Sequence, residues 1–196
     1  MIRAVLAISL TFVIALPLHA GDVDIQEMTS PDGIDAWLVE ETSIPFTALE
    51  ITFKGGHSLD PPDKRGAVNL MTGLIEEGAG DLDAQGFAAT RDALAASFSF
   101  DSSRDEVTIS ARFLSENRDE AIALLREALI NPRFDQTALD RVREQVLSGI
   151  RSDAQDPNEV AGRAFSELAF SDDHPYGHDT EGTTESVSAL SREDIV

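Results

Sequence analysis

The chain has 196 residues, with 15 Lys and Arg against 36 Asp and Glu, so its formal net charge is −21. Hydrophobic residues make up 42% of the sequence, a share that is typical of a globular domain and too high for an intrinsically disordered chain. A surface this acidic repels phosphate backbones, which argues against nucleic-acid binding. Because the sequence contains no cysteine, a disulfide framework, a cysteine zinc site and a cysteine nucleophile are excluded.

Residues 1–20 have the pattern of a secretory signal peptide. Arg3 supplies the positive charge, residues 4–16 are apolar apart from one serine and one threonine, and Pro17 ends the run. Ala20 is a small residue at the cleavage position, so we expect the mature chain to begin at Gly21. The apolar run is too short for a membrane span, and an uncleaved anchor is the alternative. Export without cysteines favours the bacterial periplasm, with no stable membrane insertion after cleavage.

The sequence pattern of residues 21–196 predicts three strands first, then helices with two further strands between them, and only helices in the second half. Alternating apolar residues and flanking turns predict strands over residues 23–28, 34–40, 47–53, 98–100 and 107–113. Apolar residues at helical spacing predict helices over residues 66–77, 84–96, 121–129, 139–150 and from 157 onward. Asp83 and Asp156 are the expected N-caps of two of these helices, and Gly78 is the expected C-cap of the first. This order is typical of a single α+β domain.

Several short motifs follow one another along the mature chain. They are Gly55-Gly56-His57-Ser58-Leu59-Asp60-Pro61-Pro62 with Lys64-Arg65-Gly66-Ala67, Asn131-Pro132-Arg133-Phe134, Leu139-Asp140-Arg141-Val142-Arg143, Asp153-Ala154-Gln155-Asp156-Pro157, and His174-Pro175-Tyr176-Gly177 before Gly182-Thr183. In this order they resemble the insulinase/pitrilysin family of zinc metallopeptidases. The resemblance covers nearly all of the mature chain.

The resemblance implies a half-domain of the insulinase, pitrilysin and mitochondrial processing peptidase type. Such a domain has a mixed, largely antiparallel sheet with helices packed on one face. Residues 21–196 would be the N-terminal peptidase domain, truncated before its last strand, because the family's domain continues past a helix that starts here near Ser191. We therefore expect these residues alone to be poorly stable, with one sheet position unpaired.

The family's chemistry depends on an inverted zinc motif, His-x-x-Glu-His, and a glutamate from a later helix. The two histidines and the later glutamate hold zinc, and the motif's glutamate activates the bound water. The resemblance places Asn69 and Gly73 at the histidine positions, Thr72 at the base position and Gly149 at the third ligand. An amide, a hydroxyl and two hydrogens cannot replace these groups. We therefore expect no catalytic residue and no metal ligand in this chain.

Two other metal sites are possible from the residue types. Residues 81–86 with Asp92 imitate a calcium loop, although Asp83 as a helix cap is the simpler interpretation. The three mature histidines, His57, His174 and His178, could form an atypical metal site, but the Pro and Gly around the last two predict a loop instead. Glu76 and Glu77 are expected to be a solvated helix end.

In this family, bacterial forms often occur as pairs of a zinc-bearing chain and a degenerate chain, which enclose a chamber where peptides are cut. The resemblance thus implies a non-catalytic periplasmic subunit that forms one wall of the chamber, with zinc only in a catalytically active partner. Peptides would add to a sheet edge, and the strand at Ser97–Asp101 is the candidate. The alternatives are a metalloenzyme with atypical ligands, and an assembly or peptide-binding module without a proteolytic role.

Overall fold

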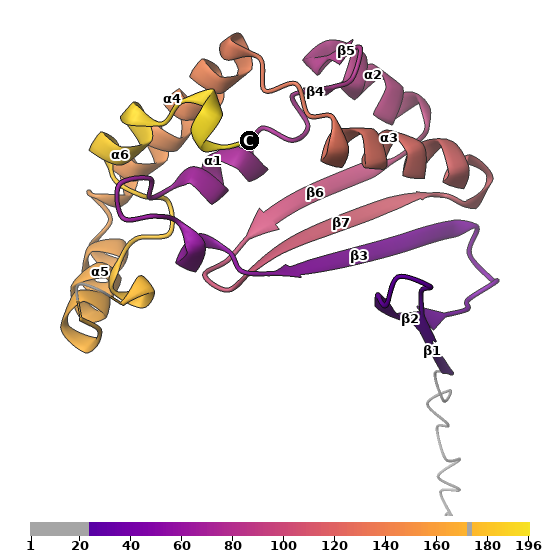
Figure 1. The fold of residues 1–196 in the computed structure, drawn as a ribbon, viewed down its shortest axis with the longest axis horizontal. Helices are drawn as coiled ribbons and strands as arrows, with labels where there is room; N and C mark the ends of the chain where they lie inside the picture. Colours follow the sequence, from indigo (N-terminus) through magenta and orange to yellow (C-terminus); the bar gives the residue numbers. More distant parts are fainter. Residues whose placement is uncertain (1–23, 172–173) are drawn as a thin grey trace, which may run out of the picture. The chain divides into compact units, whose positions relative to one another are not determined.

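A computed structural model describes residues 24–171 and 174–196 of the chain (Figure 1). The expected signal peptide, residues 1–20, and its cleavage site before Gly21 lie outside the described residues. The chain divides into two compact units, residues 1–44 and residues 45–196, and each is described by itself. Of the helices in the described ranges, none has both the length and the apolar character that crossing a bilayer requires.

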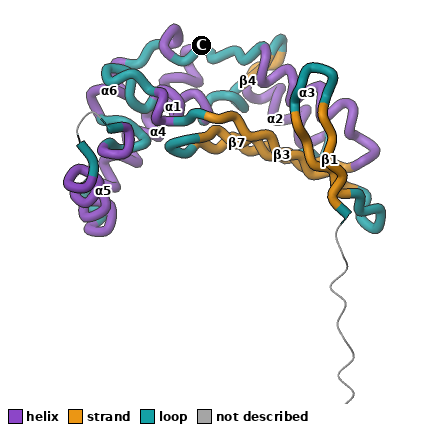
Figure 2. Tube along the Cα trace, turned by 60° about the horizontal axis from the view of Figure 1, so that its bottom comes forward, coloured by secondary structure: helices purple, strands orange, loops and turns teal. Residues whose placement is uncertain are grey.

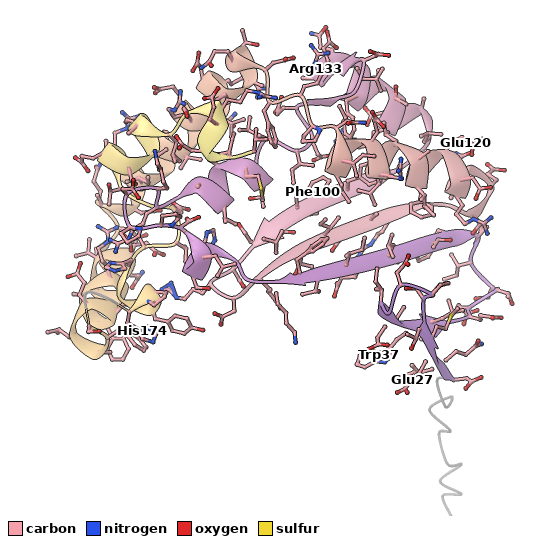
Figure 3. The ribbon with its side chains drawn as sticks, viewed as in Figure 1. Glu27, Trp37, Phe100, Glu120, Arg133 and His174 are labelled. Carbon is pink, nitrogen blue, oxygen red and sulfur yellow. The ribbon has the colours of Figure 1, made fainter. Side chains whose placement is uncertain are left out.

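The described part of the first unit contains a two-stranded antiparallel hairpin, as the sequence predicted. Strand β1 (Ile25–Thr29) pairs with β2 (Asp35–Val39). The turn between them closes with a hydrogen bond from the Gly33 amide to the Ser30 carbonyl, 2.9 Å long. All residues of both strands are exposed, and the side chain of Trp37, labelled in Figure 3, reaches 79% exposure.

The second unit is built on a three-stranded antiparallel sheet. Its order is β3 (Phe46–Lys54), β7 (Glu106–Leu114) and β6 (Ser97–Ser102), so β7 is the central strand. Ile109 of β7 stands opposite Ile51 on one side and Phe100 on the other. This apolar row belongs to the face that packs into the core, and helices lie over that face (Figures 1 and 2).

The remaining elements of the second unit are helices, short helical turns and one small hairpin. The α-helices are α1 (Ala67–Thr72), α2 (Ala84–Ala93), α3 (Arg118–Ile130), α4 (Gln136–Asp153), α5 (Pro157–Ala169) and α6 (Thr184–Ala189). The 3₁₀ turns and the small hairpin are η1 (His57–Leu59), η2 (Ser115–Asn117), η3 (Pro175–Gly177), η4 (Arg192–Asp194), β4 (Gly78–Ala79) and β5 (Leu82–Asp83). Leu70, Phe87 and Leu139 are completely buried where α1, α2 and α4 contribute to the core.

Two predicted helices are shorter in the structure than the sequence suggested. The helix expected over 66–77 ends at Thr72, and Gly78 begins β4 instead of capping it. The helix expected over 84–96 ends at Ala93. Helix α6 was not predicted from the sequence, and the segment after Ser191, where a helix was expected, is a 3₁₀ turn. The expected N-caps are confirmed, because Asp83 accepts a hydrogen bond from the Gly86 amide and Asp156 from the Asn158 amide.

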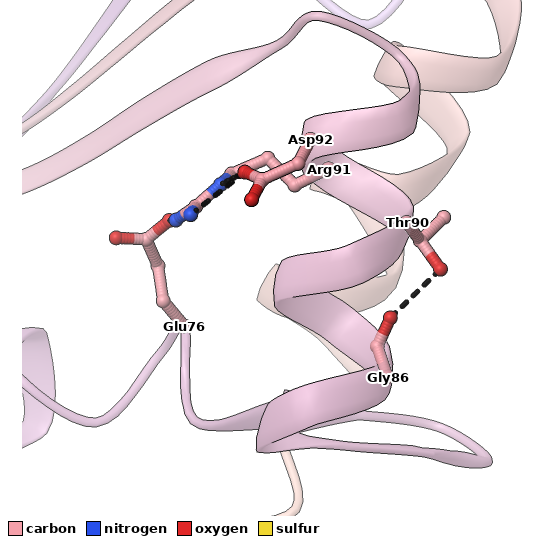
Figure 4. A network of polar contacts seen from close by, with 5 residues as sticks. All are labelled: Glu76, Gly86, Thr90, Arg91 and Asp92. Carbon is pink, nitrogen blue, oxygen red and sulfur yellow. Dashed lines mark hydrogen bonds and ion pairs between the residues drawn. The ribbon is translucent and has the colours of Figure 1, made fainter.

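Glu76 and Glu77 are not a solvated helix end. Glu76 accepts a 2.7 Å hydrogen bond from Arg91 of α2, and Arg91 also pairs with Asp92 (Figure 4). Glu77 forms an ion pair with Arg141 of α4. The two carboxylates therefore connect the segment after α1 to two different helices.

Candidate functional site

The start of α1 is held by contacts from the loop before it and from Glu181. Gly66 precedes the helix with φ of 90°, a left-handed conformation that favours glycine, and a Cβ there would collide with the Glu181 carbonyl. The Asp60 carboxylate accepts hydrogen bonds from the amides of Gly66 (2.8 Å) and Val68 (3.1 Å). Burial raises the pKa of Asp60, and these backbone hydrogen bonds oppose that shift. These contacts fix the position of the helix on which the resemblance places the degenerate zinc-motif residues.

Three of the four degenerate zinc-motif positions lie on or directly after α1. Asn69 and Thr72 are within the helix, and Gly73 is its C-cap. Gly73 packs closely on α4, since a Cβ there would lie 3.1 Å from Cγ1 of Val142. Gly149, the fourth position, follows Val142 by seven residues and therefore lies on the same side of α4.

Thr72, which the resemblance places at the position of the catalytic base, is only 6% exposed. Its hydroxyl donates to the Asn69 carbonyl at 3.0 Å and lies 3.3 Å from the hydroxyl of Ser102, at the end of β6. The contact with Ser102 joins α1 to the sheet. A threonine hydroxyl has no useful basicity near neutral pH, so this position cannot activate water.

A carboxylate from another segment lies close to Gly149. The Oε2 atom of Glu181 would be 3.8 Å from a Cβ at Gly149. Burial raises the pKa of Glu181, and the nearby carboxylates of Asp153 and Asp179 raise it further. Glu181 was not predicted as a site residue, because it lies 32 residues beyond Gly149 and no local pattern connects the two.

Glu181 lines a pocket of about 280 Å³ between α4, α5 and the loop at 179–182. Arg163 of α5 lies in this pocket, and its Nε atom forms a 2.6 Å ion pair with Asp179. Gly162 opens onto the same space, with no atom within 4 Å of a Cβ placed there. The pocket is polar and is lined by four carboxylates and two arginines.

His57 and His178 line one pocket, but each has its own polar partner, and His174 does not line that pocket. The Nε2 atom of His57 lies 3.2 Å from the Ser102 carbonyl, and Nε2 of His178 lies 2.7 Å from a guanidinium nitrogen of Arg65. His174 stacks on Phe170 at 5.1 Å, beside α5 (Figure 3). In the parts of the chain that the structure describes, no three His, Asp or Glu residues are grouped as metal ligands would be.

The helix cap that the sequence favoured over a calcium loop at residues 81–86 is confirmed. Leu82 and Asp83 form β5, and the carboxylate of Asp83 caps α2 through the Gly86 amide at 2.8 Å. The residues that a calcium loop would need are therefore part of a strand and a helix.

The His174-Pro175-Tyr176-Gly177 motif connects α5 to the sheet. The Tyr176 hydroxyl donates to the Asp105 carboxylate in the β6–β7 turn. Arg104 of the same turn lies 5.4 Å from the centre of the Tyr176 ring and donates to the His178 carbonyl at 3.5 Å. This motif is structural in the described chain.

The candidate peptide-docking strand, Ser97–Asp101, lies within β6. Among the described residues, β6 forms a ladder with β7 and with no second strand. Its side chains alternate, with Phe98 buried and Ser99 exposed. One edge of β6 therefore has no strand paired to it in the described sheet.

The model of the family described as Insulinase (Peptidase family M16) matches residues 37–184. The chain belongs to the insulinase family. It is a degenerate member, because histidine and glutamate are missing at the positions where the resemblance places the zinc motif. The predicted α+β fold is confirmed by a similar crystal structure, that of the "peptidase M16 inactive domain" from Pseudomonas fluorescens. That structure aligns with a TM-score of 0.82 and 25% identity over 88% of this chain and 42% of that chain.

Two related proteins with different names match most of the chain. The "Non-peptidase homolog YmxG" of Helicobacter pylori is 31% identical over 156 residues, which are 80% of this chain and 36% of that protein. A probable mitochondrial-processing peptidase subunit beta of Arabidopsis thaliana is 20% identical over 85% of this chain and 31% of that protein. The chain thus spans about a third of the length of these relatives.

Proposed function

We propose that this chain is the non-catalytic subunit of a periplasmic insulinase-type peptidase pair and forms one wall of the chamber in which peptides are cut. Zinc and the catalytic base belong to the active homologous partner. One contrast around α1 carries the proposal. The hydrogen bonds that hold the helix start, the sheet contact and the His-Pro-Tyr-Gly loop are all formed. The expected zinc positions, however, have no side chain that could serve as a zinc ligand. The names of the relatives, a non-peptidase homologue and an inactive domain, agree with it.

The role of this subunit is to position peptides. The unpaired edge of β6 offers backbone donors and acceptors to an extended peptide, which would add as a further strand. Main-chain hydrogen bonds form whatever the side chains of the peptide are, so this mode of binding would suit a peptidase that degrades peptides of varied sequence. The strongly acidic surface excludes nucleic acid as the competing polymer.

Affinity capture of the tagged, full-length protein from its own periplasm tests the pairing. We expect a stoichiometric homologue carrying His-x-x-Glu-His, identified by mass spectrometry. Elemental analysis should find about one zinc per complex and none in the separated chain, because only the partner has the ligands. A capture of the same protein from cytoplasm, where the exported partner is scarce, is the control. Recovery of the chain alone, or zinc retained by the separated chain, would overturn the proposal.

A further inference from the structure

Helix α5 presents its apolar side to water. Val160, Ala164 and Leu168 follow one another at four-residue intervals, and Phe165 lies beside them on the same side of the helix. Val160, Phe165 and Leu168 are 46%, 70% and 89% exposed, and no residue of α5 is buried. These four residues are called the α5 stripe below.

The polar side of α5 faces the rest of the second unit. Glu159, Gly162, Arg163 and Ser166 line the 280 Å³ pocket described above, and Arg163 pairs with Asp179. This is the reverse of an ordinary surface helix, whose apolar side faces the core. Exposed apolar residues that are grouped in this way mark an interaction surface more often than scattered ones do.

The charges around the α5 stripe restrict what can cover it. The acidic residues Asp156 and Glu167 are exposed on or next to α5, whereas its one basic residue, Arg163, is paired on the opposite side. A second copy would bring an equally acidic surface and a further charge of −21. Helices that lie on membranes carry Lys and Arg to meet anionic lipids, and α5 has the opposite charge.

We propose that the α5 stripe is the docking surface for a partner protein that presents apolar side chains bordered by Lys and Arg. The apolar contact supplies the centre of the interface, and the acidic border selects a basic rim and accelerates association. A stable interface needs about 800 Å² on each side, more than one short helix offers, so the acidic surface around α5 takes part as well. The inference goes beyond the pairing proposed above, because it involves neither β6 nor the degenerate zinc positions.

The test uses the full chain and a fluorescent amphipathic peptide of Leu and Lys, about 18 residues long so that it can form a helix. Fluorescence anisotropy should show binding that weakens with salt. The double variant Phe165→Ser/Leu168→Ser should weaken binding roughly tenfold or more, because both side chains would be central to the contact. Glu167→Lys should weaken binding several-fold, chiefly at low salt, without removing any apolar contact.

The matched control is Leu59→Ser/Ile130→Ser, which removes two apolar side chains that are 69% and 52% exposed elsewhere in the second unit. It should bind the peptide as the unmodified chain does. All variants should keep the same melting temperature, since the substituted side chains are exposed.

Four outcomes would overturn the proposal. Equal affinity of the stripe variant and the control would mean that the peptide binds acidic surface in general. A dimer seen by sedimentation that the stripe variant abolishes would identify a second copy as the occupant. Binding to phosphatidylglycerol vesicles that the stripe variant loses would identify a membrane. A lowered melting temperature of the stripe variant alone would show that the chain itself covers the stripe.

Discussion

At the scale of single residues, Gly149 is the degenerate position that packing explains least. It lies inside α4, where glycine is costly because its backbone loses more freedom on folding than alanine's does. A Cβ at this position meets only Glu181, at an ordinary contact distance of 3.8 Å. Neither a close approach nor a left-handed backbone angle therefore requires glycine at position 149.

Gly149→Ala should stabilise the chain. The expected gain in the free energy of unfolding is about 1 kcal/mol, the difference in helix propensity between the two residues. Urea unfolding of the full chain, followed by circular dichroism, measures it. Gly73→Ala is the comparison, because its Cβ would lie 3.1 Å from Val142 and the gain should be smaller or absent. If Gly149→Ala does not stabilise the chain, the pocket beside Glu181 needs the space that glycine leaves.

At the scale of elements, the sequence predicted where helices begin better than where they end. The helix expected over 66–77 fails at Gly73, yet Leu74 and Ile75 are buried as the helical spacing predicted. The chain continues in tight turns, in which the amides of Leu74 and Glu77 bond to carbonyls three residues earlier. Apolar spacing thus identifies the buried residues, but it does not distinguish a helix from successive turns.

A contact from a distant segment stabilises the end of α2. Ala95 follows the helix with φ of 49°, a left-handed conformation that alanine rarely adopts. The side-chain amide of Asn117 donates to the Leu94 carbonyl at 2.9 Å and so satisfies a group at the helix end. Because Asn117 lies 23 residues further on, no local pattern predicts this contact.

For the candidate site, too, the sequence predicted residues that belong to local motifs and did not predict a residue that packing brings in from a distant segment. The four degenerate positions follow from motifs that are local in sequence, so the chain alone was enough to question its zinc chemistry. The position of Glu181 beside Gly149 depends on how α4, α5 and the loop at 179–182 pack together. Residue spacing contains no information on that packing.

The 3₁₀ turn η4 gives a pH-dependent prediction. Hydrogen bonds from Lys64 and from Ser191 lower the pKa of Asp194 from its ordinary value of 3.8 to about 2. A carboxyl whose pKa is lowered in the folded state stabilises the fold above its unfolded pKa and loses that contribution as the pH falls through its folded pKa. Asp194→Asn should therefore destabilise the chain near neutral pH, and the difference should vanish between about pH 4 and pH 2.

Urea midpoints measured across this pH range test the prediction. The control is Glu193→Gln, which removes an exposed neighbouring charge. The ion pair between Lys64 and Asp194 is at the surface, so high salt should reduce the effect. A destabilisation by Asp194→Asn that is equally large at pH 2 would show that the effect is not due to the charge.

At the scale of the whole molecule, pairing differs sharply between the strands. Strand β7 has partners on both sides and buries Ile109, Ala111 and Phe113. In the part of the chain that the structure describes, β3 and β6 are each paired on one side, and the β1–β2 hairpin consists of two strands whose residues are all exposed. Backbone hydrogen bonds that are exposed and supported by few buried contacts open at low free energy. The molecule should therefore have a graded rather than a uniform resistance to opening.

Hydrogen exchange followed by mass spectrometry measures this gradient. We expect amide exchange to be slowest in β7 and fastest in the β1–β2 hairpin, since an isolated two-stranded hairpin is marginally stable at best. An added unfolded peptide should slow exchange in β6, the strand proposed for docking, more than in β3, which is the other edge strand of the described sheet. The control peptide has the same sequence with alternate backbone nitrogens methylated, which removes the donors for strand pairing, and it should give no protection. Protection of β3 or of the helices in place of β6 would locate peptide docking elsewhere, and a hairpin that exchanges as slowly as β7 would contradict the gradient.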